Sequence, residues 1–504
     1  MNKTRTNINN EKRMNIISWT IVLLVGIMVC LFFGEWLRVE DDSASYILDE
    51  RREGVMPIYP FFLMLMRLFV GDLNYLNVVV LIQGLLAIFC TLYFVVTIQK
   101  QIHFSYFDRI VVYVVCLLPY AVNLPEISSP HIILTEGLTY PLFYLYFAFL
   151  LKTVWKQSYL WFTIMYMMSI IMALVRSQML FLLIISLCVF GYLCLRRSKK
   201  KHKFATVLLA LVIMAVGFIG GYKFIYKITD SYSRMPSLKE AVITEELAEI
   251  VEESEQQQHQ ITENNKQNAV GKPNPNVQET NSQITSLLII RGFFEAEEED
   301  YQLFDNEMVR YVFQKAYKMA QEEERLYNYA RKDLYMWKDI IYDRMGVFIY
   351  NAIDQYDLEH PGERTVSRDS IQKEIGIKLI VHHLGRYIYH TIRLMIPSFI
   401  SSVFFQIEPI YLLCHFITLV LYLAAIGISI YGICKKNNKD VMQGMLSVLF
   451  FNTMMVGIIN AVFVGHQRYV IYGMGVFYCF IYLAYKEIAI EWCDKLFRQD
   501  RKGR

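Results

Sequence analysis

The chain has 504 residues, of which 55% are hydrophobic and only 19% are charged, whereas a soluble domain usually has about a quarter of its residues charged. The net charge of +3 gives no basic excess of the kind that marks a nucleic-acid partner. The nine cysteines lie in or beside apolar runs, so neither a disulfide framework nor a CxxC metal site is indicated. These features indicate an integral membrane protein.

Apolar runs of membrane-spanning length follow one another along the chain, since about 18–24 residues cross a hydrocarbon core of about 30 Å. Ten spans are predicted, at residues 16–33, 75–98, 110–124, 132–151, 159–175, 178–195, 205–226, 410–434, 441–464 and 469–486. No cleavage site follows the first run, so we expect an uncleaved anchor. The apolar stretch 391–407 carries Arg393 and Pro397 and predicts a helix lying at the membrane interface.

The basic residues of the short loops predict the orientation, because cytoplasmic loops carry an excess of Lys and Arg. With both termini in the cytoplasm, the inner loops hold Lys100, Lys152, the cluster from Arg196 to Lys203, and Lys435 with Lys436. The inverse topology would place almost every basic cluster outside. A multi-pass protein of the cell membrane is therefore expected, with residues 227–395 on the extracytoplasmic side.

Three parts follow from this topology: an N-terminal transmembrane module over 1–226, an extracytoplasmic region over 227–395 and a C-terminal transmembrane module over 396–504. Residues 245–283 are rich in Glu, Gln and Asn and predict a disordered segment. Helical periodicity returns over 301–395, where a helix at about 370–393 has Asp369 or Ser370 as its N-cap candidate. The expected fold class is all-α, with about ten transmembrane helices, membrane-parallel helices in the outer loops and a small helical extracytoplasmic region.

The strongest candidate for chemistry follows the first span, at Glu40-Asp41-Asp42. Like charges in contact raise the pKa of at least one member, and a carboxylate tuned in this way suits a general base. A solvated acidic cap at the end of the span is the alternative reading. The turn Pro57-Ile58-Tyr59-Pro60 then leads into an apolar helix at about 61–70 that is too short to cross a membrane.

An Asp four residues before a Tyr, here Asp42 and Tyr46, followed by Pro-x-Tyr-Pro and an apolar helix, resembles the GT-C superfamily of membrane glycosyltransferases, such as protein O-mannosyltransferases and the aminoarabinose transferase of lipid A. Leu134-Thr135-Glu136-Gly137-Leu138, the Arg176 turn, residues 377–396 and His466-Gln467-Arg468-Tyr469 resemble further family segments. The resemblance covers most of 15–225 and about 375–486. Ser43 and Val55 depart from the family pattern, which often has Glu and Arg at those positions.

The resemblance implies transfer of a sugar from a polyprenyl-phosphate donor to an acceptor at the outer face of the membrane, with inversion. Asp42, assisted by Asp41, would deprotonate the acceptor hydroxyl. Arg176, Arg468 and His466 would bind the donor phosphate, since Arg binds phosphate oxygens bidentately; interfacial anchoring is the other reading of each. The supporting residues would be Tyr46, Tyr59, Glu136 and Tyr469.

Metal binding has weaker signals. The acidic run 295–300 is more typical of a solvated helix start, and His382, His383, Tyr387 and His390 are more typical of interfacial contacts. No metal ligand is therefore predicted, although a divalent metal remains compatible with the family. The expected partners are the lipid-linked donor, membrane lipid and a cell-surface acceptor, without nucleic acid.

Two other functions fit part of the sequence. A cell-surface polysaccharide polymerase or ligase also has many spans and a large outer loop, but relies on Arg-rich outer loops. A lipid or polysaccharide transporter calls for paired broken helices or charges near mid-bilayer, and Glu136 is almost the only such charge.

Overall fold

The computed structural model describes residues 2–33, 36–39, 43, 46, 56–71, 73–102, 104–121, 130–197, 203–233, 277, 289, 291–323, 336–401, 411–435, 439–462 and 471–502. Over these residues the chain is helical, which confirms the predicted all-α class. The one β-type pairing within the described part is an isolated bridge between Arg38 and Ile132.

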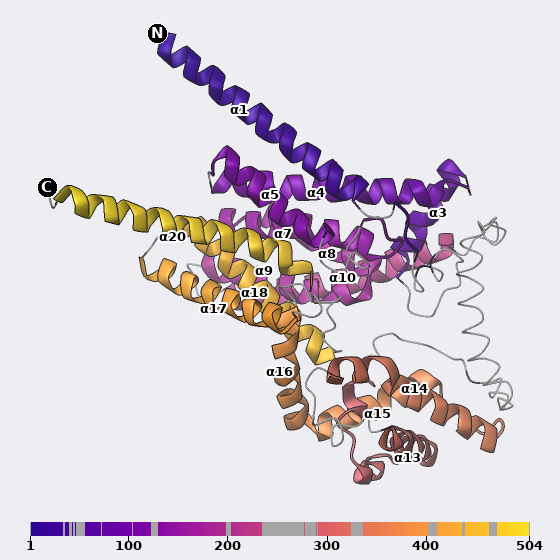
Figure 1. Ribbon diagram of the computed structural model, residues 1–504. Helices are drawn as coiled ribbons and strands as arrows, with labels where there is room; N and C mark the ends of the chain where they lie inside the picture. The colour runs from indigo at the N-terminus through magenta and orange to yellow at the C-terminus, as the bar shows by residue number, and fades with distance from the viewer. Residues whose placement is uncertain are drawn as a thin grey trace.

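Each predicted span overlaps a helix, with bounds that differ by a few residues or more. These helices are α1 (Asn2–Ile27) with its π-helical end η1 (Met28–Phe32), α4 (Tyr75–Gln101), α5 (Tyr106–Ala121), α7 (Glu136–Lys156), α8 (Tyr159–Val175), α9 (Phe181–Arg197), α10 (Lys203–Ser233), α17 (Tyr411–Lys435), α18 (Lys439–Val462) and α20 (Met474–Lys502). Both chain ends lie at one end of this bundle (Figure 1).

Among the described residues, five segments are long and apolar enough to cross a membrane: Arg13–Phe32, Tyr75–Gln101, Glu136–Lys156, Ser177–Arg196 and Lys439–Ala461. Shorter apolar helices occur at Ile58–Val70, Tyr159–Val175, Val212–Ile225 and Phe416–Gly432. A membrane protein is therefore supported, whereas the count of ten spans is not confirmed and stays a prediction.

Helix α7 lies at the centre of the bundle. It packs against α4, α8 and α18, and its aromatic side chains Tyr140, Phe143, Tyr144 and Phe147 are all buried. A helix that is apolar on all sides is stable where neighbours surround it. The outer helices show the opposite pattern, with apolar side chains such as Leu24, Leu195 and Phe416 exposed on the surface of the bundle.

The short apolar helix after the Pro-x-Tyr-Pro turn is α3 (Ile58–Val70). It begins three residues before the predicted start because Pro60 is tolerated in the first turn of a helix. Tyr59 and Leu63 are buried against the bundle, while Leu68 and Phe69 are exposed. In Figure 1, α3 lies at the end of the bundle opposite the termini.

A second hydrophobic core lies between α10 and α17 in the sequence. It joins η4 (Glu298–Leu303), α13 (Glu307–Glu322), α14 (Met336–Glu359) and α15 (Arg368–His382) around buried residues that include Phe293. Helix α16 (Leu384–Ser401) then runs across the direction of α17 and α20 and joins this core to the bundle (Figure 1). The boundaries predicted at 226 and 395 stay predictions, and the segment predicted to be disordered, 245–283, lies outside the described residues apart from Val277.

The predicted helix over 370–393 differs from the structure in two ways. The N-cap is Ser367, whose hydroxyl oxygen accepts from the Ser370 backbone N–H, so neither Asp369 nor Ser370 is the cap. The helix also ends at His382, and α16 starts at Leu384. A polar side chain three residues before a backbone N–H satisfies a donor that the helix leaves open, and the earlier Ser takes that place.

Helix α16 carries its apolar side chains on the outside. Leu384, Ile388, Ile392 and Ile396 follow one another at four-residue spacing and are about half exposed or more, at 51, 49, 59 and 58%. Its opposite face carries the fully buried His390. This is the reverse of a helix on a soluble protein, which turns its polar face outward. The described part of the predicted interfacial stretch 391–407 lies in α16.

Candidate active site at the start of α7

Five of the residues singled out by the sequence, Asp41, Asp42, His466, Arg468 and Tyr469, lie outside the described residues. The other four, Tyr46, Tyr59, Glu136 and Arg176, belong to one region around the start of α7. They come from the loop that follows the first helix, α3, α7 and the end of α8.

Arg38, in the loop after the first helix, is hydrogen-bonded to the chain that enters α7. The Arg38 N–H donates to the His131 carbonyl oxygen at 3.1 Å, and the Ile133 N–H donates to the Arg38 carbonyl oxygen at 3.0 Å. These two bonds form the isolated bridge. Asp41 and Asp42 follow Arg38 by three and four residues, and Glu136 follows Ile133 by three. The bridge thus joins Arg38 to the described segment that leads into Glu136.

The end of the first helix also contacts this region. Helix α1 changes to the π-helical η1 over Met28–Phe32, and the Cys30 carbonyl oxygen lies 3.0 Å from His131 Nε2. A carbonyl only accepts, so His131 carries its proton on Nε2. Helix α4 approaches closely here, since a Cβ at Gly84 would lie 2.7 Å from the Cys30 oxygen.

Gln83 connects three elements through one fully buried side chain. Its Nε2 donates to the Pro130 carbonyl at 2.7 Å and to the Ile132 carbonyl at 2.9 Å. Its Oε1 accepts from the Tyr59 hydroxyl at 3.0 Å. Because a buried polar group is costly unless hydrogen-bonded, these three bonds fix α3 and α4 on the chain that leads to Glu136.

Tyr46 and Tyr59, both predicted as supporting residues, pack edge to face with ring centroids 5.2 Å apart. Tyr59 is fully buried. Its hydroxyl bonds to Gln83, so in this structure Tyr59 supports the frame of the site. Through this contact Tyr46 packs on α3.

Glu136 and Arg176 form an ion pair with each other. Both are buried, with 1 and 7% of each residue exposed. The Thr135 hydroxyl donates to Glu136 Oε2 at 2.9 Å, and Arg176 Nη1 donates to the Thr135 hydroxyl at 3.0 Å. Arg176 Nε also donates to Gln178 Oε1. The guanidinium is therefore held by three neighbours, and each charge is neutralised where a lone charge would be very costly.

The chain entering α20 packs one turn further along α7. The hydroxyls of Thr139 and Tyr472 lie 3.2 Å apart, and the Tyr140 hydroxyl donates to the Ile471 carbonyl at 3.5 Å. Arg468 and Tyr469 precede Ile471 by three and two residues. The described chain that follows the last predicted motif thus packs near the end of α7 that carries Glu136.

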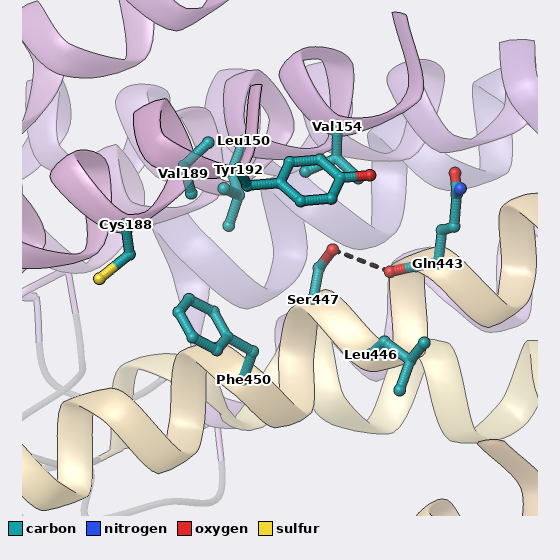
Figure 2. Close-up of a pocket in the computed structure, with 9 residues that line it drawn as sticks. All are labelled: Leu150, Val154, Cys188, Val189, Tyr192, Gln443, Leu446, Ser447 and Phe450. Atoms are coloured by element: carbon teal, nitrogen blue, oxygen red, sulfur yellow. Dashed lines mark hydrogen bonds between the residues drawn. The ribbon is translucent and has the colours of Figure 1, made fainter. Parts of the chain in front are cut away.

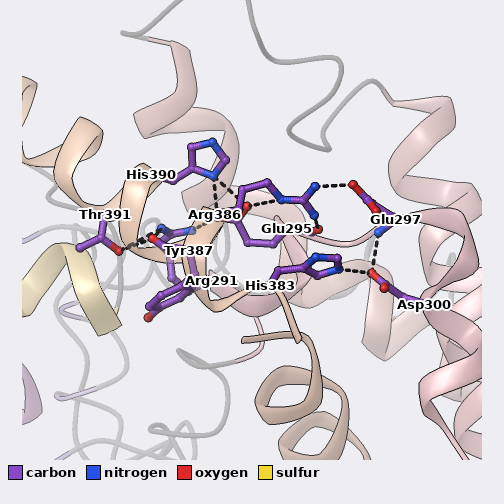
Figure 3. A network of polar contacts seen from close by, with 9 residues as sticks. All are labelled: Arg291, Glu295, Glu297, Asp300, His383, Arg386, Tyr387, His390 and Thr391. Carbon is purple, nitrogen blue, oxygen red and sulfur yellow. Dashed lines mark hydrogen bonds and ion pairs between the residues drawn. The ribbon is translucent and has the colours of Figure 1, made fainter. Parts of the chain in front are cut away.

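A second polar cluster lies on the inner face of α16, shown in Figure 3. Arg291 and Glu295 are fully buried and form an ion pair at 3.1 Å. Glu295 also accepts from His390 Nδ1 at 2.7 Å. Burial acts to raise the pKa of Glu295, but the hydrogen bond from His390 and the charge of Arg291 outweigh it, so this pKa lies below its ordinary value. Glu295 is thus ionised between Arg291 and His390.

Arg386 extends this cluster toward the surface. It contacts Glu295 Oε2 at 3.2 Å and forms an ion pair with Glu297. The hydrogen bond from Arg386 lowers the pKa of Glu297. In Figure 3, Arg386 lies between the two carboxylates.

The cluster also binds the carboxyl end of α18. Arg291 Nε donates to the Asn460 carbonyl at 3.4 Å, and the Tyr387 hydroxyl donates to the Ala461 carbonyl. The last carbonyls of a helix carry partial negative charge and lack partners within the helix. A buried Arg is well suited to this position, so the cluster fixes α16 on the helix that precedes His466 and Arg468.

Sequence reasoning identified Glu295 and His390 only as parts of an acidic run and a histidine group, and it missed Arg291 and Arg386. The sequence does hold a signal for both arginines. Arg291 stands four residues before Glu295, and Arg386 stands four residues before His390. Residues four apart share a helix face. The contact between the two segments has no signature in the sequence.

An apolar cavity of about 330 Å³ lies between α7, α9 and α18. Figure 2 shows Val154, Tyr192, Gln443 and Phe450 among its lining residues, with the Ser447 hydroxyl bonded to the Gln443 carbonyl. Val154 lies near the end of α7 opposite Glu136. The cavity therefore does not belong to the predicted site.

No protein-family model, curated protein or solved structure matches this chain.

Proposed function

We propose that this chain is a multi-pass membrane glycosyltransferase that takes a sugar from a polyprenyl-phosphate donor and transfers it to an acceptor at the outer face of the cell membrane. In this proposal all ten apolar helices cross the membrane. Both termini are cytoplasmic, and the core formed by α13 to α15 is extracytoplasmic.

One observation carries the proposal: the bridge between Arg38 and Ile132 holds the chain just before the acidic residues beside the entry to α7. General-base catalysis needs a carboxylate within reach of the reacting hydroxyl. A fixed cation is needed where the departing phosphate gains charge. The loop that carries Asp41 and Asp42 begins at this bridge, and the buried pair of Glu136 and Arg176 follows it along the chain.

The roles are assigned as follows. Asp42, assisted by Asp41, removes the proton from the acceptor hydroxyl, whose oxygen attacks the anomeric carbon from the face opposite the leaving phosphate. Arg468 and His466 bind that phosphate. Arg176 is held by Glu136, Thr135 and Gln178, so we assign it a fixed positive charge next to the donor. Tyr46, Tyr59 and Tyr469 position these groups.

The test is sugar transfer by protein reconstituted in nanodiscs with a panel of radiolabelled polyprenyl-phosphate hexoses. Asp42→Asn is expected to lower the transfer rate by about 100-fold or more, the range of a general base. Asp305→Asn is the matched control, because the Asp305 side chain is fully exposed. If Asp42→Asn and Asp41→Asn both transfer at the wild-type rate, the catalytic assignment is wrong.

The surface glycans of a deletion strain identify the acceptor. Loss of one sugar from one class of polymer supports the proposal and names the donor. Shortened chains with unchanged composition would instead indicate a polymerase. Intact sugars that accumulate inside the cell would indicate a transporter.

A further inference from the structure

The break between α15 and α16 brings two histidines toward one carboxylate. His382 ends α15 and His383 is its C-cap, and their ring centroids lie 4.7 Å apart with planes at 80°. Successive residues in a continuous helix point about 100° apart. Because the helix stops at His383, both rings reach the same neighbour, Asp300 in η4.

The Asp300 carboxylate is oriented by a backbone hydrogen bond within its own segment. It is 4% exposed, and its Oδ2 accepts from the Glu297 N–H at 2.7 Å as half of a capping box. His383 Nε2 lies 2.7 Å from the same Oδ2. The other oxygen, Oδ1, lies 3.9 Å from His382 Nε2. Figure 3 shows His383 and Asp300 facing each other at the edge of the polar cluster.

We propose that Asp300, His382 and His383 form a binding site for a divalent transition-metal ion, with Zn²⁺ as the preferred ion. The ligand atoms of the three residues all lie within 4.8 Å of one another. Two imidazoles and one carboxylate are a usual ligand set for Zn²⁺, with bonds of about 2.0–2.2 Å. The ion takes the place of the hydrogen bond between His383 and Asp300.

The surroundings favour a cation in spite of the nearby arginine. Arg386 is neutralised by Glu295 and Glu297, and Asp300 brings a further negative charge. The His382 side chain is 53% exposed, so one side of the ion faces solvent. Three protein ligands leave a fourth position of a tetrahedral site for water or an anionic oxygen.

The ion would join two segments that are more than 80 residues apart in the sequence. Asp300 belongs to η4, which follows the buried Glu295, and His383 precedes the first residue of α16. A metal at this corner fixes the polar cluster that holds α16 against α18. The proposal is independent of the sugar-transfer reaction, since it rests on ligand geometry alone.

The experiment uses the full-length protein purified through a tag without histidine, stripped with a chelator and reloaded with Zn²⁺ or Co²⁺. Mass spectrometry of bound metal is expected to give one Zn²⁺ per chain at saturation. Co²⁺ is expected to give the visible absorption of a four-coordinate site. His382→Gln is the main variant, because this side chain is 53% exposed and its replacement is expected to leave the fold intact. The Zn²⁺ affinity of the variant is expected to fall at least about tenfold.

His383→Gln and Asp300→Asn are expected to show the same loss. Asp305→Asn and His360→Gln are matched controls outside the site and keep one equivalent. The proposal is overturned if the wild-type protein takes up neither metal, or if His382→Gln binds Zn²⁺ as tightly as the wild-type protein does. Should Asp300→Asn fail to fold, the His382→Gln result decides.

Discussion

Glu136 and Arg176 neutralise each other where the start of α7 meets the end of α8, with side chains that are only 1 and 8% exposed. Removing one partner of a buried pair leaves a charge without compensation, which costs about 3–5 kcal/mol. We therefore expect Glu136→Gln and Arg176→Met each to lower the melting temperature of the detergent-solubilised protein strongly, as measured by intrinsic fluorescence. The double variant Glu136→Leu/Arg176→Met is expected to recover most of the loss.

Lys318→Met is the control for this pair. Lys318 and Glu322 are 75 and 67% exposed and lie 4.0 Å apart, and exposed pairs contribute little. A melting temperature that drops as far for Lys318→Met as for Arg176→Met would contradict the argument.

Gln83→Leu removes three hydrogen bonds from a fully buried site. The carbonyls of Pro130 and Ile132 would lose a partner, at about 1–3 kcal/mol for each buried group left unsatisfied. Tyr59→Phe removes only one of the three bonds and is expected to cost less. Denaturant unfolding measures how much free energy of unfolding each variant loses. Equal losses would show that Gln83 does not connect α3 and α4 to the chain before α7.

Gly292→Ala tests the contact that brings the arginine segment onto α15. A Cβ at Gly292 would lie 2.6 Å from the Gly376 carbonyl oxygen, and overpacking of this kind costs about 1–3 kcal/mol. Gly385→Ala is the matched control, since nothing lies within 4 Å of its Cβ position, and it is expected to leave stability unchanged or raise it. Similar melting temperatures for both variants would refute the close approach.

The pKa values of Glu295 and Glu297 are lowered from 4.5 in the folded protein. The folded state therefore binds fewer protons than the unfolded state, and stability falls as the pH decreases through the folded pKa values. We expect a melting temperature that is steady above about pH 5 and declines below pH 4.5. Glu297→Gln is expected to reduce this decline; a decline of unchanged size in that variant would exclude Glu297 as a source.

The exposed stripe of α16 is expected to lie in lipid. With a photoactivatable lipid in nanodiscs, mass spectrometry should find labels on Ile388, Ile392 and Ile396. Helix α13 is expected to stay unlabelled, since its exposed positions, such as Lys318, are charged. Labelling of α13 at the level of α16 would contradict the proposed topology.

The approximate positions of the helices could be predicted from the sequence because each long apolar run corresponds to a helix. The stop at His383 could not, since the nearest Gly, Gly385, lies within α16 and the contact of His383 with Asp300 has no signature in the sequence. The two backbone carbonyls that Gln83 binds could not be predicted either, because they belong to a segment that is distant in the sequence. Glu136 and Arg176 were each found by their charge in an apolar setting, but their pairing needed the structure.

Because α16 turns its apolar face outward and its charged face inward, we expect residues 289–401 to be poorly soluble in water as an isolated fragment. Separated from the bundle, this piece would present Leu384, Ile388, Ile392 and Ile396 to solvent as one continuous patch, and large exposed apolar patches promote aggregation. Production of the region as a soluble fragment would need polar replacements along that stripe. The inner face, with Arg291 and Glu295, would have to stay unchanged.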